Sequence, residues 1–402
     1  MTASLSWLDH SEHERQKFLH VIDMFREQGT VDELGIGTIR DVFADALFPG
    51  TSTIQTRAGY FLFIPWMYRE FERLKVPSGN IERAARNAEI RLIDALVEAG
   101  ERDGVIGISA RRTLKRLPSN VYWNGLMSWG IRLFPGSQPQ YHRSMDSFNA
   151  SPRRMTVNED REATGETTHV NWHPHLPAPP PDFPKVASLA LRRADAAYLR
   201  ERIKARHPHT MLEVLVSGAA ITLPTSYPWE HPHLSELPVA IADQLHHARC
   251  FAEVMHGGAL LYNLMLSQAV PNEELVTEYE SRLADWSDLV EQRRPVLESW
   301  DRDRFWQHAE PAGRNLLRDR FIDSWIDLAL APGATATLES SAAARNLIAQ
   351  RETQLKRARA RLHNDRALAL WTGFSGADML TYRWPVVRTM LLDIQEGLAR
   401  HA

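Results

Sequence analysis

Cysteine is almost absent from this sequence, because Cys250 is the only one in 402 residues. A single thiol excludes an intramolecular disulfide, a zinc site built from several thiolates and an iron–sulfur cluster held by cysteines. Long apolar runs are missing too, since no uncharged stretch approaches the roughly 20 residues that a membrane-spanning helix requires. The first residues, MTASLSWLDHSEHERQKFLHV, lack the basic start and apolar centre of a signal peptide. We therefore expect a cytoplasmic protein with no membrane contact.

The short motifs of common enzymes are also missing. The sequence contains neither the GxxxxGK[ST] phosphate loop nor the GxGxxG dinucleotide loop. GFSG at 373–376 is not the GxSxG of serine hydrolases, so we interpret it as a turn. The net charge is −3 at pH 7, so any nucleic-acid site has to be a local patch. We therefore favour a protein without catalytic activity and predict no cofactor, with a divalent metal left open as an alternative.

Helical periodicity dominates what the sequence does contain. Hydrophobic residues make up 44% and charged residues 24% of the chain, which is typical of a globular protein with a sizeable core. Apolar side chains that recur every three or four residues predict a mainly α fold. Short strands, if present, are expected at 101–108 or 211–223. One helix is expected to begin at Ser11 and another to follow Asn272. The other expected helices span 38–49, 52–76, 80–100, 109–117, 120–131, 193–206, 236–269, 297–308, 314–330, 339–363 and 385–400.

A proline-rich stretch, HPHLPAPPPDFP at 173–184, predicts the main domain boundary. Such a stretch favours an extended, semi-rigid spacer, and the residues before it, from about 136, are polar and irregular. We therefore expect a multi-helix N-terminal domain over 1–150, an irregular linker over 151–185 and a helical-bundle C-terminal domain over 186–402.

Two segments concentrate positive charge. Residues 105–145 contain no Asp or Glu and interleave basic with aromatic side chains, and two short helices that meet at Pro118 would fit a helix-turn-helix variant. The second segment lies along the expected helix 339–363. The alternative is that the aromatics belong to the core and the arginines are solvated or paired with acids elsewhere. The candidate nucleic-acid-binding residues are Arg111, Arg112, Lys115, Arg116, Trp123, Arg132, Arg351, Lys356, Arg357 and Arg361.

The tripeptide His-Pro-His occurs three times, and residues two apart in an extended segment point the same way. Both imidazoles of each pair are therefore candidate metal ligands, although exposed proline-rich turns without a metal are the alternative. The six candidates are His173, His175, His207, His209, His231 and His233.

The expected helix 236–269 carries a second set of polar side chains on one face: Asp243, His246 or His247, Cys250, Glu253 and His256. The Glu-x-x-His at its end is half of the motif that di-iron helical bundles use. The other copy, Glu166-x-x-His169, falls outside any expected helix. We therefore interpret this face as a polar packing seam.

Four stretches carry a resemblance that spans essentially the full chain: SLSWLDHSEHERQ (4–16), DELGIGTIRDVFADALFPGTSTIQTRAGYFLFIPW (32–66), TLKRLPSNVYWNGLMSWGI (113–131) and LWTGFSGADMLTYRWPVVRTMLLDIQEGL (370–398). In this order they resemble a prokaryotic family of domains of unknown function, number 6361 in that series. Members of that family are encoded beside helicase and phospholipase-D-like nuclease genes in phage-defence neighbourhoods. The resemblance therefore implies an accessory subunit of a defence assembly, and it supplies no catalytic residues.

The preferred hypothesis is a non-enzymatic accessory subunit of a bacterial anti-phage defence system. It would bind other defence proteins, with the helicase and the nuclease as candidates, and DNA or RNA phosphates through the basic segments. One alternative is a metal-dependent hydrolase or nuclease with His, Asp and Glu ligands. The other is a sensor of a phage component.

Overall fold

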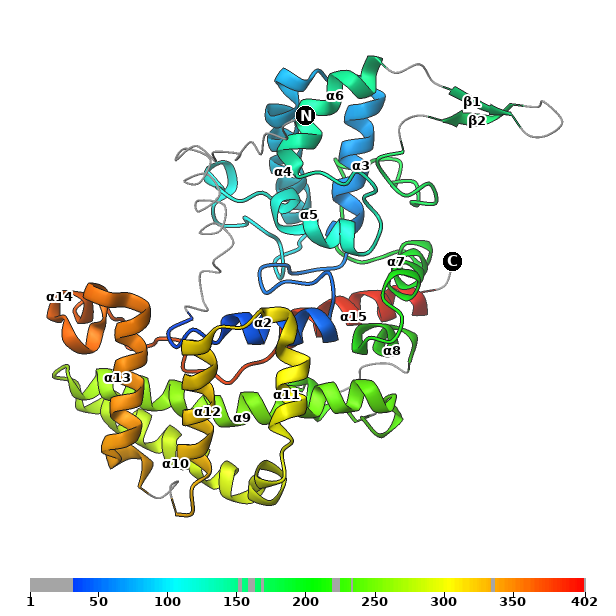
Figure 1. The fold of residues 1–402 in the computed structure, drawn as a ribbon. Helices are drawn as coiled ribbons and strands as arrows, with labels where there is room; N and C mark the ends of the chain where they lie inside the picture. Colours follow the sequence, from blue (N-terminus) through cyan, green and yellow to red (C-terminus); the bar gives the residue numbers. More distant parts are fainter. Residues whose placement is uncertain are drawn as a thin grey trace, which may run out of the picture. The chain divides into compact units, whose positions relative to one another are not determined.

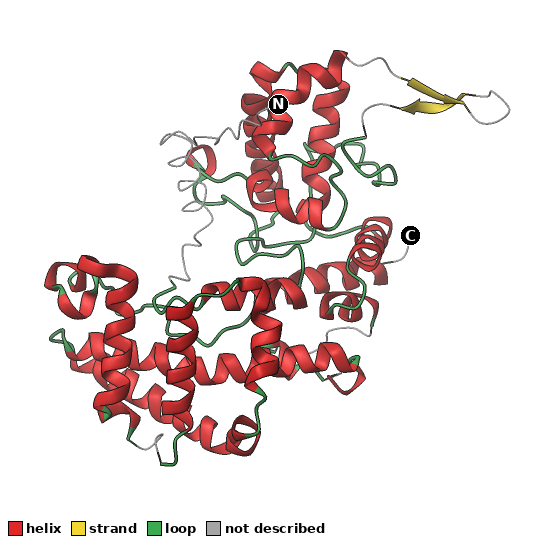
Figure 2. Cartoon of the chain, in the orientation of Figure 1, coloured by secondary structure: helices red, strands yellow, loops and turns green. Residues whose placement is uncertain are grey.

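The structure is a computed structural model that describes residues 32–150, 154–157, 163–167, 170–218, 225–232, 234–333 and 337–400. Helices account for most of these residues, and the strands among them form a single two-stranded hairpin (Figures 1 and 2). The expectation of a mainly α fold is confirmed. The helix expected from Ser11 lies outside the described residues.

The elements follow one another as a long series of helices with one hairpin between α6 and α7. Strands β1 (Arg154–Val157) and β2 (Ala163–Thr167) pair antiparallel. Short 3₁₀ helices connect several of the longer elements. The α-helices are α2 (Gly37–Leu47), α3 (Tyr60–Arg73), α4 (Ser78–Glu98), α5 (Pro118–Ser128), α6 (Gln138–Ala150), α7 (Arg193–Arg206), α8 (Met211–Ser217), α9 (Val239–Gln268), α10 (Glu273–Glu298), α11 (Arg302–Ala309), α12 (Leu316–Leu330), α13 (Ala342–Lys356), α14 (Asp365–Leu368) and α15 (Trp384–Ala399).

Local capping explains where the helices of the second half begin. The side chains of Asn272, Asp301, Asn315 and Ser341 each accept a hydrogen bond from the backbone N–H three residues further on. Such a cap satisfies one of the N–H groups that the first turn of a helix leaves unpaired. Capping residues in the sequence therefore determine where α10, α11, α12 and α13 begin.

Local patterns are less reliable in four places. Residues 211–217 form helix α8 and not a strand, because Thr210 caps them by accepting the N–H of Glu213. The helix expected over 109–117 is reduced to one 3₁₀ turn, Arg111–Thr113, with Arg111 at a φ of 46°. Residues expected to be irregular form α6, and no strand occurs among 101–108.

The chain divides into two compact units, and neither is continuous in sequence. Unit 1 comprises Met1–Arg40 and His247–Leu380, and unit 2 comprises Asp41–His246 and Thr381–Ala402. The chain thus passes between the units three times, twice within a helix, α2 and α9. The boundary predicted at 151–185 falls inside unit 2, and each of the two predicted domains contributes residues to both units.

The proline-rich stretch belongs to unit 2 and packs against its helix α3 instead of spacing two domains. The indole N–H of Trp66 in α3 donates to the carbonyl of Pro177 at 2.7 Å. The ring of Phe183 stacks on Phe63, with 5.7 Å between centroids, and meets Trp66 edge-on at 5.2 Å. Aromatic side chains of α3 therefore hold the stretch in place.

Unit 2 contains an aromatic core and a buried ion pair. Phe61 in α3 stacks on Trp129, with 3.8 Å between ring centroids. Arg57 pairs with the buried Asp393 of α15 at 2.6 Å. Helices α7 and α15 pack closely, and a Cβ added at Gly397 would lie 2.7 Å from the Cβ of Ala196. Helix α15 is thus anchored to elements that precede it by about two hundred residues or more.

Unit 1 is held by tryptophans that pack on the long helix α9. The indole N–H groups of Trp286 in α10 and Trp325 in α12 donate to the carbonyls of Glu253 and Val254, at 2.7 and 2.9 Å. Trp286 lies over Gly257, where an added Cβ would come within 2.3 Å of the ring. Helices α10 and α12 are therefore fixed against one stretch of α9.

Candidate functional site

The first basic segment is only partly open to solvent. Arg112 and Lys115 are exposed, whereas Arg111 pairs with Asp94 at 2.6 Å. Trp123 and Arg132 are buried, and the Arg132 guanidinium lies 4.6 Å from the centre of the Trp123 ring. It also donates to the carbonyls of Trp123 and Gly136, and burial lowers the pKa of Arg132 to about 10. Trp123 and Arg132 therefore contribute to the core and not to an open surface.

Three of the four candidate residues in the second basic segment are bonded to other groups of the protein. Arg351 is buried and donates to the carbonyls of Leu34 and Gly35. Lys356 pairs with Glu352 at 2.9 Å and also with Glu33. Arg361 pairs with Glu33 at 2.7 Å, while Arg357 and Arg359 are exposed. Because Arg351 and Lys356 are both bonded within the protein, α13 presents no continuous basic face.

The His-Pro-His motifs do not assemble a metal site within the described residues. Their histidines are absent from the groups of three or more potential ligands that the described part of the chain brings within 4.8 Å. His175 and His209 are exposed, and His231 is buried 6.2 Å from the Trp384 ring. His173 and His207 contact Arg202 and Ser128 respectively. His233 lies outside the described residues.

The polar face of α9 is a packing seam over most of its length. Buried Glu253 pairs with Arg249 and Arg293, at 2.7 and 3.1 Å. Nε2 of His256 bonds to the carbonyl of Ala377 at 3.1 Å, and burial lowers the pKa of this histidine to about 4. Cys250 is buried, which raises the pKa of its thiol to about 12 and leaves it without reactive thiolate at neutral pH. None of these groups is presented to a ligand.

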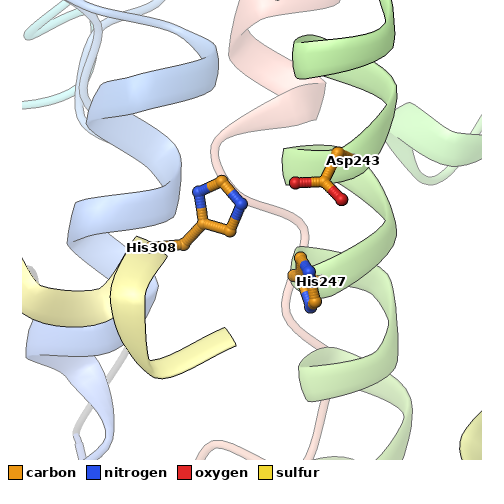
Figure 3. A group of neighbouring side chains, drawn as sticks. All are labelled: Asp243, His247 and His308. Atoms are coloured by element: carbon orange, nitrogen blue, oxygen red, sulfur yellow. The ribbon is translucent and has the colours of Figure 1, made fainter. Parts of the chain in front are cut away.

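The first turns of α9 carry one cluster with the composition of a metal site. Asp243, His247 and His308 each offer a ligand atom, and these atoms all lie within 4.8 Å of one another (Figure 3). Asp243 and His247 are one turn apart on α9, and His308 comes from α11, which starts at its cap Asp301. Sequence reasoning found the first two residues but not His308, because nothing in the sequence relates α11 to α9.

A hydrogen bond from Trp300 determines which ring nitrogen of His247 carries the proton, and therefore whether this cluster suits a metal ion. The indole N–H of Trp300 donates to Nδ1 of His247 at 2.8 Å. Since an indole N–H can only donate, Nδ1 accepts and the proton of the neutral imidazole lies on Nε2. A metal-bound histidine instead presents one bare nitrogen and donates its other N–H to an acceptor. The geometry therefore suits a hydrogen-bonded polar cluster better than a metal centre.

This tautomer gives a testable expectation. We expect the purified protein to contain no stoichiometric metal and Co²⁺ to leave its Tm unchanged. Trp300→Phe removes the donor, so the proton can move to Nδ1 and Nε2 becomes available to a cation. Co²⁺ at 100 times its Kd should then stabilise the variant by about 2.7 kcal/mol.

Elemental analysis, the visible absorption of bound Co²⁺ and Tm measurements would check this expectation. Trp306→Phe is the matched control, because that indole donates to Asp323 outside the cluster and its loss should not create Co²⁺ binding. One equivalent of metal in the parent protein would show that the assigned tautomer is wrong.

A separate cavity lies between α11 and α12. Its volume is about 500 Å³. Trp306 bonds to Asp323 across it at 3.0 Å, and burial raises the pKa of this carboxyl. Three of its aspartates are spaced by four along α12, which the sequence could have revealed as an acidic stripe. The lining residues are Asp303, Trp306, Arg314, Leu316, Asp319, Arg320, Asp323, Ser324 and Asp327.

Comparison with known proteins identifies the family. The sequence model of a family of unknown function, DUF6361, matches residues 2–397. The chain belongs to this family. No curated protein and no solved structure matches the chain. The predicted family resemblance is thus confirmed, while a role in phage defence stays a prediction.

Two neighbouring leucines of this DUF6361 protein are exposed where α12 begins. Leu316, which lines the α11–α12 cavity, is 71% exposed and Leu317 is 55% exposed. None of the described helices of this family member combines the length and the apolar composition that a membrane crossing requires. The leucines and the cavity together are named the α11–α12 surface below.

Proposed function

We propose that this protein is a non-enzymatic subunit of a cytoplasmic anti-phage assembly and binds a partner protein through the α11–α12 surface. The observation that carries the proposal is the coincidence of exposed apolar side chains with excess carboxylates. Leu316 and Leu317 are adjacent and solvent-exposed, and the lining of the cavity contains four aspartates against two arginines. Apolar anchors within a polar rim are typical of protein interfaces.

The chemistry of this surface defines its partner. An amphipathic helix with apolar side chains on one edge and Lys or Arg beside them would cover the two leucines. Its basic side chains would face Asp303 and Asp327, both of which are exposed. Asp327 already accepts from Arg302 at 2.5 Å and Asp319 from Arg318 at 2.7 Å. Asp303 is therefore the better placed carboxylate for a new ion pair. The partner helix is therefore expected to be basic.

The place in phage defence rests on the family resemblance. It makes the neighbouring helicase and the phospholipase-D-like nuclease the first partners to test. Polar groups elsewhere in unit 1 already bond to other side chains: His247 accepts a hydrogen bond from Trp300, and Glu253 pairs with two arginines. These bonds support the proposed absence of catalysis. Those contacts hold the side chains in structural roles.

Replacing both leucines by aspartate tests the surface. Leu316→Asp/Leu317→Asp places two more negative charges beside an acidic cavity and removes the apolar anchors, so capture of the co-expressed helicase or nuclease should fall at least tenfold. Both leucines are exposed, so the Tm should stay near that of the parent. The measurement is affinity purification of the tagged full-length chain with its genomic neighbours.

The control for this experiment is Leu370→Asp. Leu370 is 79% exposed and lies in the same unit, away from α12 in sequence. It should leave capture unchanged, and an equal loss in both variants would contradict a specific role for the α11–α12 surface. A partner that is recovered only from infected cells and is encoded by the phage would favour the sensor hypothesis.

A further inference from the structure

Two neighbouring side chains of unit 2 each carry a buried polar atom without a hydrogen-bond partner among the described residues. Nδ1 of His173 and the hydroxyl of Tyr198 are withdrawn from solvent and make no hydrogen bond within the described residues. Tyr198 lies on α7 and His173 in the loop that precedes it, and the centroids of the two rings are 5.6 Å apart. A buried polar group without a partner is unfavourable, so this pair indicates a missing acceptor.

The contact of His173 with Arg202 fixes which of its nitrogens carries the proton. Arg202 Nη1 lies 2.8 Å from Nε2 of His173. A guanidinium can only donate, so Nε2 accepts and the neutral ring holds its proton on Nδ1. Burial and the positive charge of Arg202 lower the pKa of His173, which keeps the ring neutral at pH 7. The unpartnered Nδ1 is therefore an N–H donor, and no bare nitrogen remains for a metal.

The charges around the two rings are positive within the described part of the chain. Burial raises the pKa of Tyr198, and the positive charges of Arg202 and Arg69 oppose that rise. The charged groups that act on His173 are Arg202 and His175. Arg69 is exposed on α3, and its charge acts on Tyr198. The nearby carboxylate of Glu72 interacts with the charge of Arg69, but it is buried and accepts hydrogen bonds from Tyr141, Asn171 and Trp172. The charged groups that act on Tyr198 and His173 themselves are positive.

Arg202 is held in a fixed position. Its Nε donates to the carbonyl of Trp129 at 3.2 Å while Nη1 contacts His173. Nη2 passes so close to Gly130 that a Cβ there would lie 2.9 Å away. Gly130 has a φ of 65°, so both its backbone and the approach of Arg202 favour glycine at this position. The guanidinium is preorganised before any ligand arrives.

We propose that His173, Tyr198, Arg202 and Arg69 form a binding site for a phosphate group. A phosphate offers several acceptor oxygens and negative charge, which suits an imidazole N–H, a phenol O–H and two guanidinium groups. This site lies outside both basic segments singled out in the sequence. It also lies apart in sequence from the α11–α12 surface and does not depend on the function proposed for that surface.

The phosphate can belong to a small molecule or to a polynucleotide, and the test separates these sources. Binding of inorganic phosphate to the full-length protein is measured by calorimetry at low salt. A 5′-phosphorylated oligonucleotide and its dephosphorylated counterpart are then used as competitors. Competition by both oligonucleotides assigns the site to backbone phosphates, competition by the phosphorylated one alone to a terminal phosphate, and competition by neither to a free phosphate compound.

Variants connect the binding to the named side chains. Tyr198→Phe keeps the ring and removes only the hydroxyl, and Arg69→Gln removes an exposed charge, so each should weaken phosphate binding about tenfold or more. His209→Asn is the matched control, because His209 is an exposed histidine of another His-Pro-His motif whose φ of 64° asparagine tolerates. It should bind phosphate like the parent.

Two results would overturn the proposal. One is a parent protein that binds no phosphate at millimolar concentration. The other is phosphate binding that Tyr198→Phe and Arg69→Gln leave unchanged while both variants keep the Tm of the parent.

Discussion

The Glu352→Ala variant should lose about 3 to 5 kcal/mol of its free energy of unfolding, because it removes a buried acceptor on which four donors converge. Glu352 is fully buried in α13. Its carboxylate pairs with Lys356 at 2.9 Å and accepts the hydroxyl of Tyr262 at 2.5 Å. It also accepts the backbone N–H groups of Arg361 and Leu362, at 2.8 and 3.0 Å. Alanine would leave all four donors without this acceptor.

Urea denaturation measures the loss, and two further variants make it interpretable. Gln354→Ala changes an exposed residue of the same helix and should cost less than about 0.5 kcal/mol. Glu352→Gln keeps an acceptor oxygen but not the charge, so it should fall between the parent and Glu352→Ala. A Glu352→Ala protein as stable as Gln354→Ala would contradict the role assigned to this network.

The Glu89→Gln variant should be more stable than the parent at pH 8 and equally stable at pH 4. Glu89 in α4 is fully buried, and burial raises its pKa from 4.5 to about 7 although Ser119 donates both its N–H and its hydroxyl to the carboxylate. The folded state therefore binds the proton more tightly than the unfolded state between these pH values. The parent loses this contribution as the pH rises through 7, by about 3 kcal/mol in total.

The measurement is the difference in the free energy of unfolding between variant and parent from pH 4 to pH 8. Glutamine resembles the protonated acid, since its amide oxygen can accept the N–H of Ser119 and its NH₂ group can donate to the hydroxyl. Glu98→Gln alters an exposed carboxylate at the end of the same helix, and its difference from the parent should show no comparable rise. A flat difference for Glu89→Gln would rule out the raised pKa.

The sequence predicts most helices of the second half because their signals are local. Asn272, Asn315 and Ser341 each indicate the start of a helix, because their side chains accept a hydrogen bond from the backbone N–H three residues further on. The stop of α13 is harder to see. Its last residue is Lys356, and Arg357 takes a φ of 51° that nothing in the neighbouring sequence requires. The predicted helix 339–363 is therefore too long.

Whether the side chains of the basic segments are bonded within the protein depends on residues that are distant in sequence. Arg351 donates to carbonyls of the turn at Leu34 and Gly35, more than three hundred positions away. Glu33 from the same turn pairs with Arg361. A count of charges along the chain cannot contain this information, because it depends on which helix the turn contacts.

The candidate sites also depend on contacts between residues that are distant in sequence. Asp243 and His247 are one turn apart, so the sequence places them on one face of a helix. His308 and Trp300, which decide what the cluster can do, join it only through tertiary packing. The repeated His-Pro-His motifs predict metal ligands, yet His173 accepts a hydrogen bond from Arg202. Its neighbour Tyr198 carried no signal at all.

The interleaved order of the two units limits how this chain can be cut. A gene fragment that stops in the proline-rich stretch would omit α15, whose Asp393 pairs with Arg57. A fragment that begins after this stretch would omit the turn at 33–35, whose carbonyls and carboxylate hold α13 and Arg361. Neither half contains all the contacts that stabilise its own helices. We therefore expect that a segment exchanged between relatives is tolerated only if its contacts elsewhere in the chain are kept.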